Sequence, residues 1–190
     1  MAEPAELKLP FGNGDIWLRA IEPSDAMAML PYFSNPDVCR YIPWEPRDLA
    51  GVSKFISERA LAQVPVSDGE HFILGIETQM HGLVGQLNFT LKSAKDSSGE
   101  FGYVINPAFG GEGIATLAVE IFLQLLFVEL GFRRVTAWID SRNQRSIALA
   151  NRIGMRLEAT EVEVELFKGE LVTMHSYALL SREWPSKTTL

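Results

Sequence analysis

The chain alternates between segments in which apolar residues recur every second position and segments in which they recur at helical spacing. The first kind predicts strands at residues 15–20, 71–77, 83–91, 100–106, 133–140, 161–167 and 173–180. The second kind predicts helices at residues 21–35, 48–64, 114–130 and 143–154. The expected order of elements is therefore β-α-α-β-β-β-α-β-α-β-β.

This order has a cluster of strands in the middle, with helices interleaved. Such an arrangement is typical of an α/β (α+β) fold in which helices pack on both faces of a mixed sheet. No internal repeat, linker or low-complexity segment divides the chain, although residues 183–190 are expected to form a loose tail. We therefore expect residues 1–190 to form a single domain.

Composition narrows the class of protein. The chain has 190 residues, 47% of them hydrophobic, and a mean hydropathy of +0.06, which is typical of a soluble globular domain. The net charge is −7 and no block of lysine or arginine is present, which argues against binding to nucleic acid or to an anionic membrane. The amino terminus has no secretory pattern, and residues 121–132 are too short to cross a bilayer.

Cysteine and histidine usage argues against a metal site. The single Cys39 excludes an internal disulfide and a cysteine-based zinc site, and it fits a reducing cytoplasm, where we expect it to be a small buried apolar residue. His71, His81 and His175 show no metal-ligand spacing and no evident carboxylate partner. No metal is expected.

Three glycines stand between a predicted strand and the most apolar predicted helix. Gly110, Gly111 and Gly113 would let the first N–H groups of that helix turn towards an anion, most often a phosphate. No lysine follows them as in a Walker A loop, and Thr116 occupies the place of the third glycine of a dinucleotide fingerprint. Glu112 would have to turn its carboxylate to solvent. The alternative is a glycine loop that only reverses the chain direction and binds no ligand.

The motifs, taken together, resemble a known family. NPAFGGEGIATLA followed by FVELGFRRVTAWIDSRNQRSIALANRIGM is similar to the GNAT superfamily of acetyl-CoA-dependent N-acetyltransferases, and within it to the RimJ/RimL branch, which acetylates ribosomal-protein N-termini. IWLRAIEPSDAMAML, LVGQLNFT, SGEFGYVINP and YALLSREW extend the resemblance over about residues 14–184. The family loop Q/R-x-x-G-x-G/A is matched except that Gly110 replaces the usual Gln or Arg, and Glu112 replaces a common basic or amide residue.

The resemblance implies a GNAT fold with a mostly antiparallel sheet in which two parallel neighbours splay apart. Acetyl-CoA would lie in that gap. Its pantetheine arm would pair with the main chain of Val104 and Ile105 and with Asn143, whose side chain is also a plausible helix cap. Its pyrophosphate would lie on the loop and helix start, which comprise Gly110, Gly111, Glu112, Gly113, Ile114, Ala115 and Thr116.

The resemblance also implies direct attack of a neutral amine on the thioester, which needs a base and an acid. Glu100 matches a family position for the base, and Glu165 matches a carboxylate implicated in the RimJ/RimL branch, although Glu161, Glu163 and Glu165 alternate and would then form a solvated stripe on one strand face. The tyrosine that many members use as the acid is here Ala150, so Ser146 is the candidate for proton donation to the thiolate and for cofactor contact.

The acceptor is an amine of unspecified kind. Tyr41 and Trp44 lie in a proline-rich segment that lines the acceptor groove in relatives, and ordinary aromatic packing is the alternative. The acceptor could be a protein N-terminal α-amine or a small amine such as a polyamine, amino sugar or antibiotic. A CoA-binding module without turnover, and a nucleotide or dinucleotide binder, stay open as rival hypotheses. Homodimers are common in this family.

Overall fold

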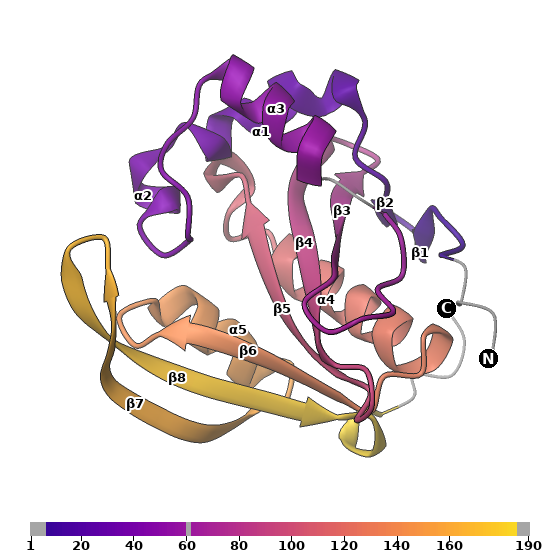
Figure 1. The fold of residues 1–190 in the computed structure, drawn as a ribbon. Helices are drawn as coiled ribbons and strands as arrows, with labels where there is room; N and C mark the ends of the chain where they lie inside the picture. The colour runs from indigo at the N-terminus through magenta and orange to yellow at the C-terminus, as the bar shows by residue number, and fades with distance from the viewer. Residues whose placement is uncertain (1–6, 60–61, 186–190) are drawn as a thin grey trace.

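The computed structural model describes residues 7–59 and 62–185 and contains one continuous eight-stranded sheet (Figure 1). Its spatial order is β1-β2-β3-β4-β5-β6-β8-β7, and every neighbouring pair is antiparallel except β5 and β6. The strands are β1 Phe11–Asn13, β2 Ile16–Arg19, β3 His71–Thr78, β4 Gly82–Ser93, β5 Ser98–Ile105, β6 Arg134–Asp140, β7 Arg156–Phe167 and β8 Glu170–Leu180.

Helices cover both faces of the sheet, as the sequence predicts. Helices α1 (Ala26–Phe33), α2 (Pro36–Cys39) and α3 (Leu49–Arg59) lie together on one side, and α4 (Ile114–Gln124) and α5 (Gln144–Arg152) lie on the other (Figure 1). A π-helical turn, Leu125–Glu129, continues α4, and short 3-10 turns stand at Pro23–Asp25, Pro107–Phe109 and Ser181–Glu183. No helix among the described residues is both long and apolar enough to cross a membrane.

Two apolar cores hold the helices on the sheet. On the α4 side, the ring of Phe72 lies 5.7 Å from that of Phe89 and 5.7 Å from that of Phe122, and all three side chains are fully buried. On the α1 and α3 side, Phe33 is fully buried and its ring lies 4.9 Å from that of Phe55. Burying aromatic rings on both faces supplies the main driving force for forming the sheet between them.

The structure adds two short elements that the hydrophobic pattern misses, β1 and α2. Four-residue α2 is too short for a periodic pattern, and it starts at Pro36 because the Asn35 side chain accepts a hydrogen bond from the Asp37 amide at 2.9 Å. Helix α3 is shorter than predicted. Ala60 and Leu61 lie outside the described residues, and residues 62–64 are not helical because Pro65 disfavours a helical conformation before it. Of the predicted loose tail, residues 186–190 are also outside the described range.

Strand β7 does not keep the simple alternation that the sequence suggests. The β7–β8 register shifts between Glu161 and Glu165, and Glu163 has a positive φ of 48°. Glu161 pairs with Met174 and Glu165 with Val172, two positions apart on β8, so the bulge leaves these two side chains on one face of the strand. The expected shared face therefore holds for Glu161 and Glu165, and the stripe is interrupted at Glu163, which lies in the bulge. Glu161 accepts a hydrogen bond from Trp138 Nε1 at 3.1 Å.

The close approach of β5 to β4 depends on a glycine. A Cβ atom on Gly99 would stand 2.1 Å from Phe89 Cζ and 2.7 Å from the Thr90 carbonyl oxygen. We expect Gly99→Ala to lower the free energy of unfolding by about 1–3 kcal/mol, because it overpacks the sheet centre. Urea denaturation of the variant measures this. Ser98→Ala is the control, and equal stability of Gly99→Ala and wild type would contradict the steric argument.

Candidate active site

The two parallel strands separate soon after they meet. Their register contains only three pairs, Ser98 with Arg134, Gly99 with Val135 and Glu100 with Thr136, although β5 continues to Ile105 and β6 to Asp140. A cavity of about 560 Å³ is lined from both strands, by residues 100–104 and 137–140. The splayed parallel pair expected from the resemblance is present. Main-chain groups on the β6-facing edge of β5 are therefore not engaged in the sheet beyond Glu100.

The glycine loop leads from β5 into α4. Gly111 has φ 92° and Gly113 has φ 81°, a left-handed conformation that side chains with a Cβ rarely adopt. Gly110, with φ −73°, has an ordinary conformation. Gly113 is the N-cap of α4 and supplies no side-chain hydrogen bond, so the N–H groups of Ile114 and Ala115 keep their donor capacity, whereas the Thr116 amide donates to the Gly113 carbonyl at 3.0 Å. Two of the three glycines are thus required by backbone geometry.

Glu112 is not simply turned to solvent. Its side chain is half exposed, and its Oε2 lies 3.7 Å from His81 Nε2. The His81 ring also stacks on Phe109 at a centroid distance of 4.6 Å. The prediction that no histidine has a carboxylate partner is therefore wrong for His81, because the β3–β4 turn approaches the glycine loop, a contact between segments far apart in sequence.

Helix α4 anchors the loop. Ile114, Ala118 and Phe122 are buried in the larger core, which fixes the start of the helix relative to the sheet. Not every apolar side chain of this segment is buried, because Leu117 on α4 and Val128 on the following π-helical turn are each 51% exposed. The helix still presents most of its surface to the core, so the donor groups at its N-terminus are held in a rigid frame.

The turn from β6 to α5 is built on Asp140. This buried carboxylate accepts hydrogen bonds from the Arg142 amide at 2.8 Å and from its guanidinium Nη2 at 2.7 Å. Burial by itself would raise the pKa of Asp140, but the Arg142 contacts outweigh it and hold the pKa below its usual range. The fixed turn places Asn143 as N-cap of α5, where its Oδ1 accepts from the Ser146 amide at 3.2 Å.

Sequence reasoning missed Tyr103. The Tyr103 hydroxyl on β5 lies 3.3 Å from Ser146 Oγ on α5, and both residues line the cavity. Burial raises the pKa of the phenol, and this effect exceeds the opposing influence of the Ser146 hydrogen bond and of the Arg152 and Arg145 charges. Nothing in the sequence links positions 43 residues apart. Ala150, where many relatives have a tyrosine, is fully buried.

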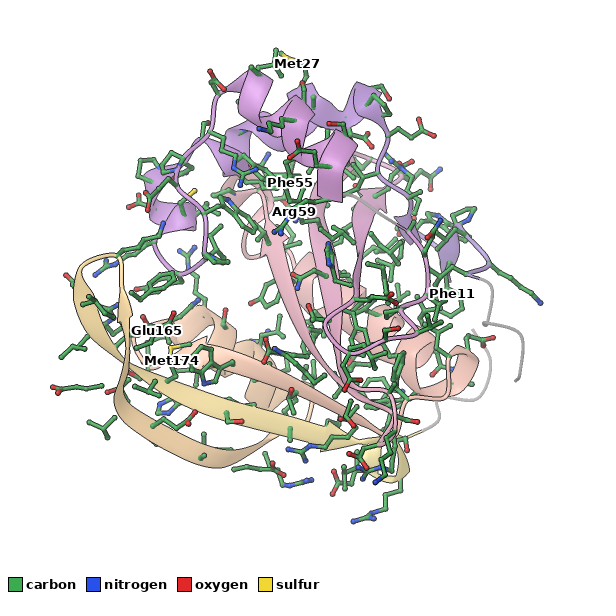
Figure 2. All side chains as sticks on the ribbon, in the orientation of Figure 1. Phe11, Met27, Phe55, Arg59, Glu165 and Met174 are labelled. Atoms are coloured by element: carbon green, nitrogen blue, oxygen red, sulfur yellow. The ribbon has the colours of Figure 1, made fainter. Side chains whose placement is uncertain are left out.

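The candidate catalytic carboxylates both line the cavity. Glu100 lies at the last pair before the strands separate, and its Oε1 is 3.4 Å from Lys92 Nζ. Glu165 stands on the β7–β8 hairpin. Figure 2 labels Phe55 and Arg59 on α3 and Glu165 on the hairpin, and all three residues line the cavity. The structure therefore brings both candidate bases to one chamber.

The remaining predicted site residues divide into two groups. Tyr41, Trp44, Val104, Asn143 and Ser146 line the cavity together with the two carboxylates. Ile105 and the loop residues 110–116 do not line it. Trp44 stacks on Phe33 with a centroid distance of 5.1 Å, so its packing role and a place in the cavity wall are compatible.

A second feature that sequence reasoning missed connects the β7–β8 hairpin to the segment that carries Tyr41 and Trp44. Lys168, at the turn between β7 and β8, donates hydrogen bonds from Nζ to the Cys39 carbonyl at 2.9 Å and to the Trp44 carbonyl at 2.8 Å. It also lies 3.3 Å from Glu45 Oε1. Figure 1 shows the tip of this hairpin facing α2. Cys39 is buried as predicted, and its carbonyl helps to tie the hairpin to the segment that carries Tyr41 and Trp44.

We expect Lys168→Ala to raise the KM for the amine acceptor about three- to tenfold. The variant loses the hydrogen bonds that hold the segment carrying Tyr41 and Trp44 in place. A loss of about 1 kcal/mol in the free energy of acceptor binding corresponds to a change of this size. The Kd for acetyl-CoA should stay within twofold, since Lys168 lies at the other end of the site. Steady-state kinetics and calorimetry measure the two quantities. Lys54→Ala, on the exposed face of α3, is the control. An unchanged KM would show that the Lys168 hydrogen bonds do not help the segment carrying Tyr41 and Trp44 to bind the acceptor.

No group of three or more His, Cys, Asp or Glu side chains within residues 7–59 and 62–185 is placed to hold a metal ion.

Comparison with known proteins identifies the family. A profile of the acetyltransferase (GNAT) domain matches residues 15–156. This chain belongs to the GNAT acetyltransferase family. Among relatives, the uncharacterized N-acetyltransferase p20 of Bacillus licheniformis is 26% identical over 168 residues, which cover 88% of this chain and 93% of that protein. The splayed strands and the glycine loop are therefore those of a GNAT acetyltransferase, an enzyme class that acts on amines.

Solved structures agree on the GNAT fold. RimL, a ribosomal L7/L12 alpha-N-protein acetyltransferase in complex with coenzyme A, has a TM-score of 0.77 at 20% identity, covering 88% of this chain and 95% of RimL. Spermidine N-acetyltransferase from Vibrio cholerae, in complex with CoA and spermine, has a TM-score of 0.74 at 20% identity, covering 90% and 99%. RimL therefore shares the fold of this chain, and identities this low compare folds rather than branches of the family or acceptors.

Proposed function

We propose that this GNAT enzyme is an acetyl-CoA-dependent N-acetyltransferase, with residues about 14–184 acting as one catalytic domain. The observation that carries the proposal is the separation of β5 and β6 after the Glu100–Thr136 pair, with a lined cavity in the gap. The unpaired β5 edge at Val104 and Ile105 fits the amides of a pantetheine arm. The left-handed glycines Gly111 and Gly113 fit a pyrophosphate laid against the first N–H groups of α4.

Acetyl-CoA supplies an activated acyl group as a thioester. The residues of the chain then have to bind the amine in its neutral form, take a proton from it and return one to the departing sulfur. Glu100 is the candidate base because it stands where the gap opens, and Glu165 is the alternative on the opposite wall. The hydroxyl of Ser146, near the start of α5, lines the cavity and is a candidate source of the proton that returns to the sulfur.

For the acceptor we propose a single α-amine at the N-terminus of a protein or peptide. Arg47 and Arg59 line the cavity, and neither has a carboxylate partner among the described residues. Glu100 and Asp140, by contrast, each already pair with a cation. Besides these groups only Glu165 adds negative charge to the lining, so the acceptor wall is not suited to a polycation. This balance disfavours a polyamine such as spermidine.

Calorimetric titration with acetyl-CoA, CoA, ATP and NAD is the first test of the donor. Saturable binding of acetyl-CoA but not of NAD or ATP supports the proposed donor site. CoA release with short N-terminal peptides and with spermidine then compares the acceptors, and turnover with peptides only is the expected result. Preference for spermidine would overturn the acceptor proposal. Acetyl-CoA binding without turnover on any amine would favour the alternative of a binding module.

A further inference from the structure

The departing thiolate needs a proton, and the site has two hydroxyls that could be its source. Tyr103 and Ser146 come from different elements, β5 and α5, and meet across the gap with 3.3 Å between their oxygens. A phenol is far more acidic than a serine hydroxyl, with an ordinary pKa of about 10, within reach of a thiol at about 8.5. Burial raises the pKa of Tyr103 above that ordinary value, but of the two hydroxyls the phenol is still the stronger acid and the better match to a thiolate.

We propose that Tyr103 is the proton donor to the leaving group of the acetyl transfer and that Ser146 supports it. This inference deepens the proposed function and rests on it. In the step, the amine nitrogen forms a bond to the acyl carbon, and the carbon–sulfur bond breaks. The sulfur keeps that electron pair and takes the Tyr103 proton. The proton lost from the amine passes to the base, and solvent re-protonates the phenolate.

The surroundings of Tyr103 fit this role. Its raised pKa keeps the phenol protonated, and therefore able to donate, throughout the neutral range. Ser146 can donate its own hydroxyl proton to the phenol oxygen, which leaves the phenol proton free for the sulfur and stabilises the phenolate once that proton has gone. The Asn143 side chain accepts a hydrogen bond from the Ser146 amide and so fixes the position of the Ser146 hydroxyl next to Tyr103.

The local packing explains why the phenol comes from the strand. At Ala150, on the buried face of α5, the side chain is only a methyl group and no hydroxyl enters the cavity from that helix position. Tyr103 lies on the same strand face as Phe101, which is buried against the α4 side of the sheet. The phenol is thereby held against α5 by the core beneath it.

The test is Tyr103→Phe, which removes one oxygen and keeps the ring. We expect kcat to fall by a factor on the order of 100, as for loss of a general acid, with the Kd for acetyl-CoA within twofold of wild type. Ser146→Ala should have a smaller effect, and the double variant should be no slower than Tyr103→Phe, since both residues act in one step. Tyr177→Phe, a buried tyrosine that does not line the cavity, is the matched control.

A chemical readout separates proton donation from a merely structural role. With acetyl-seleno-CoA, whose selenolate leaves without needing a proton, the deficit of Tyr103→Phe should largely disappear. An equal deficit with both donors, or wild-type kcat for Tyr103→Phe with acetyl-CoA, would overturn the assignment. Failure of the wild-type protein to release CoA with any amine would instead refute the proposed function itself, so the two outcomes are distinguishable.

Discussion

Replacing Gly111 and Gly113 together by valine is expected to weaken acetyl-CoA binding by a factor on the order of 100. Each glycine is in a left-handed conformation, which costs a residue with a Cβ about 1–2 kcal/mol, and more for a branched side chain. The protein can avoid this cost only by moving the loop, which takes the N–H groups of α4 away from the pyrophosphate. Calorimetry with acetyl-CoA measures the loss.

Gly110→Ala is the control for this pair of substitutions. Its φ of −73° suits any residue, and an added Cβ would meet only the Pro107 carbonyl oxygen, at 3.1 Å. Binding within about threefold of wild type is expected, because a small adjustment of this exposed turn relieves the contact. No Cβ on Gly111 or Gly113 would meet an atom within 4 Å, so their effect reports conformation rather than a clash. Normal affinity of the double variant for acetyl-CoA would refute the proposed binding of the pyrophosphate by the glycine loop.

Glu100→Gln is expected to lower kcat by about 10²–10⁴, the range for loss of a general base. The substitution keeps the shape of the side chain and removes the carboxylate that would accept the amine proton. The Kd for acetyl-CoA should not change. Steady-state rates with peptide acceptors and calorimetry with acetyl-CoA check both statements.

Glu165→Gln decides between the two carboxylates. If Glu100 is the base, Glu165→Gln should reduce kcat less than about tenfold, as expected for a residue that only positions the acceptor. A large loss in Glu165→Gln with little loss in Glu100→Gln would assign the base to the hairpin. Glu163→Gln is the matched control on the same strand, since Glu163 does not line the cavity.

Local features of the fold could be read from the sequence, and long-range contacts could not. The apolar run beginning at Ile114 and the cap at Asn143 leave local patterns, and Gly154 is found in the left-handed conformation expected after a helix end. The Glu163 bulge leaves no such trace, because a strand with two extra residues still alternates in the sequence.

The candidate site shows the same division. The residues of β5, the glycine loop and α5 follow from local motifs and from the family resemblance. The Tyr103–Ser146 contact spans 43 positions, and the Lys168 contact with the Cys39 carbonyl spans 129. Both depend on how the sheet and the hairpin are arranged in space, which no periodicity encodes. The sequence therefore predicts the glycine loop and the start of α5 better than the Tyr103–Ser146 contact or the Lys168 contact.

The short parallel contact between β5 and β6 has a consequence for the stability of the whole protein. Three residue pairs alone join the β1–β5 part of the sheet to the β6–β8–β7 part by strand pairing. A cosubstrate bound in the gap would form hydrogen bonds to the diverging edges of β5 and β6 and so connect the two parts of the sheet for as long as it stays bound. Because a ligand stabilises the folded state by RT ln(1 + [L]/Kd), the lifetime of this enzyme in a cell would rise and fall with the supply of activated acetate.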